Sequence, residues 1–191
     1  MSDWTKIQSA LDSGGVVLLP TETVYGIAAN ANSADAVSKI YDIKGRDFDK
    51  PLAVCVRNLK QAKTLAVFDT QSLALAERHW PGSLTLVLNL RDAADLDPRV
   101  TGDIQGMRTI ALRCPEADWR KFITSPLALT SANRSGEADC VDYQSAQDEL
   151  GAEIAAGLPT NIPLSGAPST IIRVDAGKLT ILRQGALKVT L

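Results

Sequence analysis

One stretch, from Leu18 to Val56, limits the folds open to this chain more than any other. It contains an apolar segment ending at Pro20, a polar turn, a helix-forming segment, a loop with three cations and a second apolar segment. Strand, crossover helix and strand in this order predict a βαβ unit, in which loops beyond the strand ends can hold a ligand. The cations Lys44, Arg46 and Lys50 indicate that this ligand is an anion.

Length and composition indicate one ordinary globular domain. With 191 residues the chain can build a substantial core, so we expect a single domain over residues 1–191. A net charge of −2 provides no overall positive field for strong non-specific binding of nucleic acid, although weak RNA binding by a local basic patch stays open. No apolar run has the length of a membrane span, and the three cysteines form no CxxC pair. We therefore expect a cytoplasmic protein that does not bind membranes.

Periodicity and turn residues predict the other elements and an α/β class. Helices are expected at residues 3–11, 33–44, 59–65, 70–80, 115–123 and 142–154. Strands are expected at residues 16–19, 52–56, 84–90, 107–114, 127–130, 169–174 and 179–183, the last two as a hairpin. Residues 91–106 are acidic, polar and unpatterned, so we expect a surface loop there.

Hydroxyl and amide side chains follow two of the predicted strands. Thr21 and Thr23 flank Glu22 after the first strand, and Ser131 and Asn133 lie in a tight turn after the strand at 127–130. Such groups can hydrogen-bond a phosphate, a ribose or a small polar substrate. The same residue types are common in plain turns and helix caps, so a structural role stays open.

Strand positions carry further cations. Alternation over residues 107–114 places Thr109 and Arg113 on one polar face, and Arg183 lies at the end of the last predicted strand. Cations at strand positions serve solubility alone less often than cations in loops do. For the Lys44 loop, a solvated surface run is the alternative.

The sequence lacks the usual marks of nucleophilic or metal chemistry. His79 is the only histidine, and no Asp or Cys is arranged near it in sequence. Neither GxxxxGK[ST] nor GxGxxG is present, so neither of these phosphate cradles holds a nucleotide. The residues instead favour an anion-binding cleft in which phosphates are positioned and neutralised, with no protein metal site.

Seven separated motifs occur in one order along the chain. They are PTETVYG at 20–26, KGR with KPL at 44–52, WPGSLTLVL at 80–88, MRTIALRCP at 107–115, LTSANRSG at 129–136, SGAPSTII at 165–172 and ILRQG at 181–185. Over about residues 16–185 the chain resembles the YrdC/TsaC family, the threonylcarbamoyl-AMP synthases, in its short single-domain form. The resemblance implies an open, twisted mixed sheet flanked by helices, with a concave basic cleft.

The resemblance also implies an activity. Family members are nucleotidyltransferases that condense L-threonine, bicarbonate and ATP to threonylcarbamoyl-AMP and pyrophosphate, with Mg²⁺ carried on the ATP. A downstream transferase then moves the threonylcarbamoyl group to tRNA. Two alternatives stay open: a non-catalytic module of the same fold that binds double-stranded RNA or tRNA, and an enzyme of the same fold that uses another amine or carbamoyl donor.

Site residues carried over from the family fall into three groups. Lys44 and Arg46 would act in catalysis, and Thr23 and Arg113 would hold threonine, with the arginine on the carboxylate. The ATP-binding group would consist of Arg46, Lys50, Thr109, Ser131, Asn133 and Arg183.

Four positions depart from the family pattern. Cys55 stands where some relatives have a histidine in the threonine pocket, and Asp139 stands where a serine is expected after SAN. Asp47 and Gln184 replace prolines. These departures concern the details of threonine and nucleotide contact.

Overall fold

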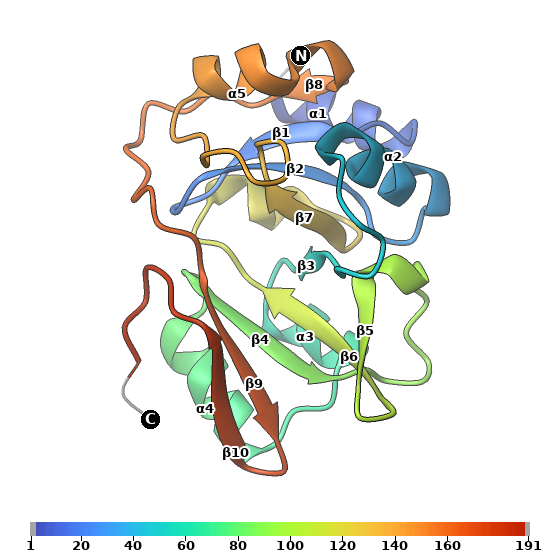
Figure 1. Cartoon of the computed structure of the whole chain (residues 1–191), viewed down its shortest axis with the longest axis vertical. Coiled ribbons are helices and arrows are strands. Elements are labelled where there is room, and N and C mark those ends of the chain that lie inside the picture. The colour runs from blue at the N-terminus through green and yellow to red at the C-terminus, as the bar shows by residue number, and fades with distance from the viewer. Residues whose placement is uncertain (1–2, 190–191) are drawn as a thin grey trace.

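One mixed sheet organises the computed structural model, which describes residues 3–189 (Figure 1). The strand order is β10-β9-β4-β6-β3-β7-β2-β1-β8, and β5 pairs with β6. The strands are β1 Val17–Pro20, β2 Tyr25–Asn30, β3 Ala53–Cys55, β4 Leu84–Asn89, β5 Thr101–Ile104, β6 Met107–Arg113, β7 Leu127–Ser131, β8 Ala156–Gly157, β9 Thr170–Asp175 and β10 Lys178–Arg183. Because β3 pairs parallel with β6 but antiparallel with β7, the predicted mixed α/β sheet is confirmed.

Helices flank both halves of this sheet. In Figure 1, α1, α2 and α5 lie around the upper strands, and α3 and α4 lie beside the lower ones. The α-helices are α1 Asp3–Asp12, α2 Ala34–Lys44, α3 Leu59–Leu65, α4 Thr70–His79 and α5 Tyr143–Leu150. Short 3₁₀ helices are η1 Pro98–Val100, η2 Asp118–Phe122 and η3 Gly151–Glu153.

The predicted βαβ unit is wrong in its first strand. Strand β2, Tyr25–Asn30, was not predicted, and it forms an antiparallel hairpin with β1 before helix α2 begins. Strands β2 and β3 both pair antiparallel with β7, so they are parallel to each other and α2 is the crossover between them. The segment YGIAAN shows no alternation because both faces of β2 are buried: Ile27 and Ala29 lie in one apolar cluster and Ala28 lies in another.

The expected loop at residues 91–106 is also wrong in part. Its second half contains η1 and strand β5, which pairs antiparallel with β6. Gln105 and Gly106 have φ of 56° and 79°, the left-handed pair that a tight hairpin turn requires. Because β5 is paired only with β6 and is partly exposed, its sequence TGDI carries no hydrophobic pattern.

Several helix boundaries follow local capping chemistry. The Ser33 side chain accepts the Ala36 N–H at the start of α2, and Gly45 ends that helix with φ of 59°. Asp142 caps α5, which stops at Leu150 before η3 instead of continuing to residue 154. The helix predicted at 115–123 is reduced to η2. The confirmed end of α2 places Lys44 beside the loop after β7.

Alternation along the central strands separates the core from a polar surface. Leu86 and Leu112 are buried in the apolar cluster that includes residues of α3 and α4. The intervening residues Thr85, Ala111 and Arg113 face a pocket on the other side of the sheet. In these central strands, one face of the sheet is therefore apolar and buried under the helices, and the other face is polar and charged toward the pocket.

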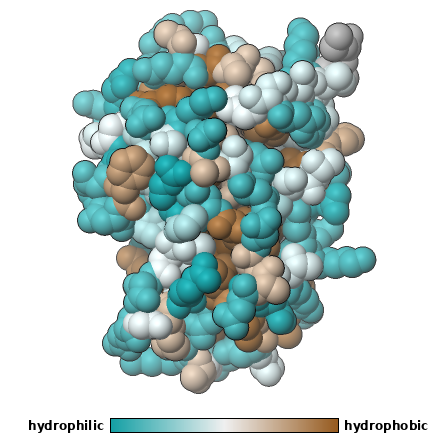
Figure 2. All heavy atoms as spheres, turned by 90° about the vertical axis from the view of Figure 1, so that its right-hand side faces the viewer, coloured by the Kyte–Doolittle hydropathy of each residue, from teal (hydrophilic) through white to brown (hydrophobic). Residues whose placement is uncertain are grey.

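Polar side chains dominate the outer surface seen from the right of Figure 1. Figure 2 shows this face covered mainly by hydrophilic residues, with apolar atoms visible in the gaps between them. Within residues 3–189, no helix combines the length and the apolar character needed to cross a bilayer.

Gly26 in β2 is required by a close strand approach, which gives a test of the fold. A Cβ at Gly26 would lie 2.9 Å from both Leu129 Cδ1 and Thr130 O. We expect Gly26→Ala to lower the free energy of unfolding by about 1–3 kcal/mol in urea denaturation, because backbone or core atoms must move. Gly151→Ala is the control, since its Cβ would meet only the flexible Gln147 side chain. Equal stability of the two variants would contradict this packing.

Candidate functional site

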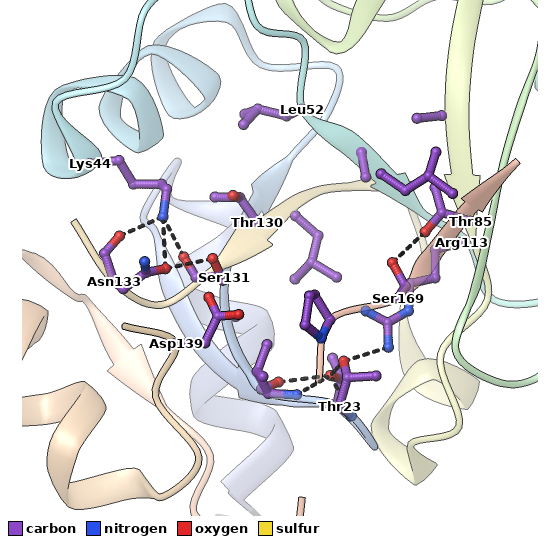
Figure 3. Close-up of a pocket in the computed structure, with 18 of the residues that line it drawn as sticks. Thr23, Lys44, Leu52, Thr85, Arg113, Thr130, Ser131, Asn133, Asp139 and Ser169 are labelled. Carbon is purple, nitrogen blue, oxygen red and sulfur yellow. Dashed lines mark hydrogen bonds between the residues drawn. The ribbon is translucent and has the colours of Figure 1, made fainter. Parts of the chain in front are cut away.

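A pocket of about 310 Å³ lies on the charged face of the sheet (Figure 3). Seven of the nine predicted site residues line it, namely Thr23, Lys44, Arg46, Arg113, Ser131, Asn133 and Arg183. They come from the β1–β2 turn, the end of α2 and the ends of β6, β7 and β10. The structure thus brings together side chains that are far apart in the sequence, while their individual roles stay predictions.

Two predicted site residues lie outside the pocket lining. The Lys50 ammonium is exposed and pairs with Asp47 at 2.6 Å. Thr109 is buried in β6, where it pairs in register with Asn89 of β4. The exposed Lys50–Asp47 pair is weak enough for Lys50 to exchange partners, whereas Thr109 is buried.

Lys44 joins helix α2 to the loop after β7. Its ammonium donates to Ser131 O at 2.7 Å, to Asn133 O, and to Asn133 Oδ1 at 3.3 Å. In return, the Lys44 carbonyl accepts the Ser135 N–H at 2.9 Å. The residue is only 4% exposed, and burial together with the Arg46 charge lowers the pKa of Lys44 to about 8. The buried ammonium therefore has a structural task before any ligand binds.

The Ser131–Asn133 turn is held by its own side chains. Ser131 Oγ donates to Asn133 Oδ1, and Asn133 Nδ2 donates to Glu137 O at 2.6 Å. Arg134 Nη1 donates to Ile43 O at 3.0 Å, which adds a second link to the end of α2. The turn is thus preorganised, and its half-buried Ser131 hydroxyl lies at the pocket wall.

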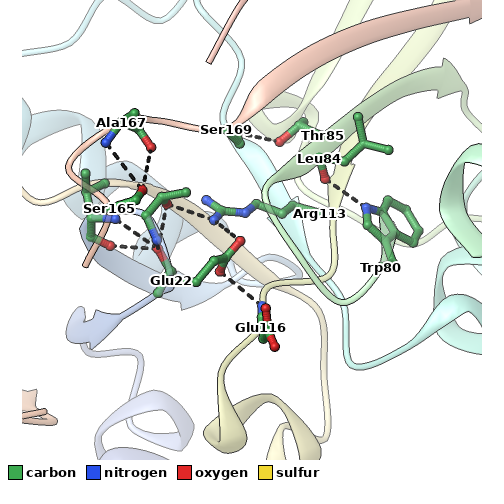
Figure 4. Close-up of polar contacts among 12 residues, drawn as sticks. Glu22, Trp80, Leu84, Thr85, Arg113, Glu116, Ser165, Ala167 and Ser169 are labelled. Carbon is green, nitrogen blue, oxygen red and sulfur yellow. Dashed lines mark hydrogen bonds and ion pairs between the residues drawn. The ribbon is translucent and has the colours of Figure 1, made fainter. Parts of the chain in front are cut away.

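A buried arginine organises the opposite wall (Figure 4). Arg113 Nη2 donates to Thr23 Oγ1 at 2.8 Å and to Glu22 Oε1 at 2.9 Å. Glu22 Oε2 accepts the Glu116 N–H at 3.0 Å, so the carboxylate is held from both sides. Arg113 is 7% exposed and its Nε has no hydrogen-bond partner. A guanidinium fixed in this way at the pocket wall is suited to binding a carboxylate.

The Thr23 hydroxyl is oriented by its neighbours. Thr21 Oγ1 donates to Val24 O at 2.7 Å, so its 2.8 Å contact with Thr23 Oγ1 requires Thr23 to be the donor. Thr23 Oγ1 in turn accepts from Arg113. The TET turn is therefore a connected network, and Glu22, whose site role was not predicted, is part of it.

Thr85 and Ser169 also line the pocket, although neither was predicted. Their hydroxyl oxygens are 2.8 Å apart, and Arg183 Nη2 donates to Ser169 O at 2.8 Å. Burial lowers the pKa of Arg183 from its usual value. Thr85 belongs to the motif WPGSLTLVL and Ser169 to the motif SGAPSTII. Membership of these motifs was the sequence signal that could have identified them.

Cations outnumber acids in this lining. The described lining contains the cations Lys44, Arg46, Arg113 and Arg183, and its acidic residue is Asp139. Cys55 does not reach the pocket, because it is buried in an apolar cluster on β3, where burial raises the pKa of its thiol. The pocket can therefore hold an anion through charge and hydrogen bonds.

Resident metal ligands are not assembled in the part of the chain that is described. Residues 3–189 contain no group of three or more His, Cys, Asp or Glu side chains arranged to hold a metal ion. The pocket instead offers guanidinium, ammonium, hydroxyl and amide groups.

The fold and the pocket together define an α/β domain with a charged site of small-molecule size. A protein-family model described as telomere recombination, and named for Sua5, YciO and YrdC, matches residues 9–185. The chain belongs to this Sua5/YciO/YrdC family, which confirms the predicted resemblance.

Individual relatives support the same assignment. A threonylcarbamoyl-AMP synthase of Bacillus subtilis is 37% identical over 180 residues, covering 90% of this chain and 50% of the relative. A putative threonylcarbamoyl-AMP synthase of Methanocaldococcus jannaschii is 31% identical over 182 residues, covering 93% of this chain and 83% of the relative.

A solved structure confirms the fold. The crystal structure of Pyrococcus abyssi Sua5 complexed with L-threonine matches with a TM-score of 0.86 and 31% identity, covering 97% of this chain and 55% of that one. The chain thus spans about half the length of the B. subtilis and P. abyssi proteins.

The depressed pKa of Lys44 predicts a pH dependence of stability. The folded chain releases this proton near pH 8, whereas the unfolded chain holds it to about pH 10.4. The unfolded state binds more protons in this window, so this residue makes stability rise with pH. We expect the stability difference between wild type and Lys44→Met to increase from pH 8 to pH 10 in urea denaturation. The exposed Lys60→Met is the control, and parallel pH curves for wild type and Lys44→Met would refute the prediction.

Proposed function

We propose that this chain, acting as one domain over residues 1–191, is a threonylcarbamoyl-AMP synthase. It would form threonylcarbamoyl-AMP and pyrophosphate from L-threonine, bicarbonate and ATP. The observation that carries this proposal is the convergence of Arg113 and Thr23 with Lys44, Arg46 and Ser131 in one pocket. Membership of the family and the names of the relatives support it.

Threonine is assigned to the wall formed by Thr23 and Arg113. The Arg113 guanidinium is held in place by Glu22 and Thr23, and its remaining donors can pair with the amino acid carboxylate. The structure of a relative, P. abyssi Sua5, holds L-threonine. The fixed guanidinium would orient the amine for reaction.

ATP is assigned to the wall formed by Arg46, Ser131, Asn133 and Arg183, with Lys50 reaching in from the surface. Lys44 can contact a phosphate by exchanging one of its bonds to the loop carbonyls. Thr109 is kept only as a sequence-based expectation, because it is buried and does not line the pocket.

The chemistry needs positioning and charge more than a protein nucleophile. The neutral amine of threonine attacks bicarbonate and water leaves, which forms a carbamate. A carbamate oxygen then attacks the α-phosphorus of ATP, and the bond to the β-phosphate oxygen breaks with its electron pair leaving on pyrophosphate. Lys44 and Arg46 would offset the charge that develops on the phosphates.

The setting of the reaction is also a proposal. Mg²⁺ would enter on the ATP, since Mg²⁺ in such sites keeps several water ligands and is held through substrate phosphates and not by an all-protein cage. The product would pass to a transferase that modifies tRNA, in the cytoplasm where threonine and ATP are available.

The decisive test is pyrophosphate release by the purified chain. We expect release only when threonine, bicarbonate and ATP are all present, and less with other amino acids. Release without threonine dependence would contradict the proposal. Steeply salt-dependent RNA binding without any turnover would favour an RNA-binding module instead.

Loss of Arg46 tests the phosphate side. We expect Arg46→Ala to lower kcat/KM for ATP by about a hundredfold, since a phosphate contact in such a site contributes about 3 kcal/mol. Arg57→Ala is the matched control, because Arg57 is exposed and does not line the pocket. An unchanged rate in Arg46→Ala would remove Arg46 from the site.

Loss of Arg113 tests the threonine side. We expect Arg113→Gln to raise KM for threonine by at least about tenfold, because a charged hydrogen bond to the carboxylate is lost. Arg108→Gln lies on the same strand, is exposed and serves as the control. Thermal unfolding of both variants separates loss of binding from loss of fold, and an unchanged KM would contradict the assignment.

A further inference from the structure

Asp139 places a half-buried carboxylate at the wall of the pocket. In Figure 3 it lies on the same side of the pocket as Ser131 and Asn133. Within residues 3–189 its carboxylate has no hydrogen bond or ion pair, whereas Glu22 on the opposite wall is paired with Arg113. This free acceptor needs an explanation in a pocket suited to anions.

The backbone around Asp139 is held in place on both sides. Asn133 Nδ2 donates to Glu137 O at 2.6 Å, and the Tyr25 N–H donates to Cys140 O at 2.9 Å. The second bond ties the residue after Asp139 to strand β2. The position of the carboxylate is therefore built into the fold and does not depend on a free loop.

Electrostatics restrict what can lie against this carboxylate. Burial is the main cause of the lowered pKa values of Lys44 and Arg183, and the Asp139 charge is close enough to offset part of that lowering. A phosphate at the same place would meet a like charge, which is costly where water is partly excluded. An ionised carboxylate accepts hydrogen bonds and donates none, so a bound group with O–H or N–H donors fits here.

We propose that Asp139 is a specificity-determining residue that accepts hydrogen bonds from an O–H or N–H donor of the substrate. This inference rests on the proposed function. The donor has two possible sources, the ribose hydroxyls of ATP and the ammonium of threonine. A carboxylate that serves only as a counter-ion to Lys44 and Arg183 would recognise neither.

The experiment compares wild type with Asp139→Ala and Asp139→Asn. The first readout is kcat/KM for ATP, 2′-deoxy-ATP and 3′-deoxy-ATP at fixed threonine and bicarbonate. The second is the dissociation constant of L-threonine alone, measured by calorimetry without nucleotide. Glu137→Ala is the matched control, since Glu137 is an exposed acid in the same loop and does not line the pocket.

Each source of the donor predicts a different result. If a ribose hydroxyl is the donor, wild type should prefer ATP over one deoxynucleotide by about ten- to a hundredfold, and Asp139→Ala should lose that preference. If the ammonium is the donor, Asp139→Ala should weaken threonine binding by a similar factor with the nucleotide preference unchanged. Asp139→Asn keeps one acceptor oxygen and should show a smaller loss in the same readout.

Other outcomes overturn the inference. Equal losses for all nucleotides with unchanged threonine binding would show a counter-ion role, and so would identical behaviour of Asp139→Ala and Glu137→Ala. If wild type releases no threonine-dependent pyrophosphate, the proposed function fails by itself. The calorimetric comparison then still decides whether Asp139 contributes to threonine binding, and unchanged affinity would overturn the inference as well.

Discussion

The pocket depends on one buried ammonium. Lys44 holds the carbonyl oxygens of Ser131 and Asn133, while its own carbonyl accepts the Ser135 N–H. These bonds join the end of α2 to the end of β7, two elements whose side chains form one wall of the site. A buried lysine without acceptors would be costly, so this arrangement specifies the position of the loop as well as its charge.

The opposite wall uses the same principle with a guanidinium. Arg113 is shared by Thr23 and Glu22, and Glu22 also accepts the Glu116 N–H. The backbone of the TET turn is further tied to the segment before β9, because Glu22 O accepts the Ser165 N–H. Strands from both halves of the sheet thus meet at a cation that is already oriented, which is preorganisation for an anionic ligand.

Local signals accounted for much of the fold. The Ser33 cap and the left-handed Gly45 set the ends of α2, and the alternation in MRTIALRCP marked the two faces of β6. Strands β2 and β5 were not predicted from the sequence, because neither segment has a hydrophobic alternation. Strand β2 is buried on both faces by apolar clusters, and β5 is partly exposed and pairs with β6, so tertiary contacts decided both.

The sequence by itself determined the residue types of the site, the class of the fold and the family. Charge, hydroxyl content and motif order can be read from the amino-acid sequence without knowledge of the fold. Only the tertiary structure decided that Arg183 and Lys44 share one pocket, that Thr109 is buried outside its lining, and that Asp139 lies at its wall. The physical reason is that a strand period assigns a side chain to a face, whereas the pairing of distant strands decides which faces meet.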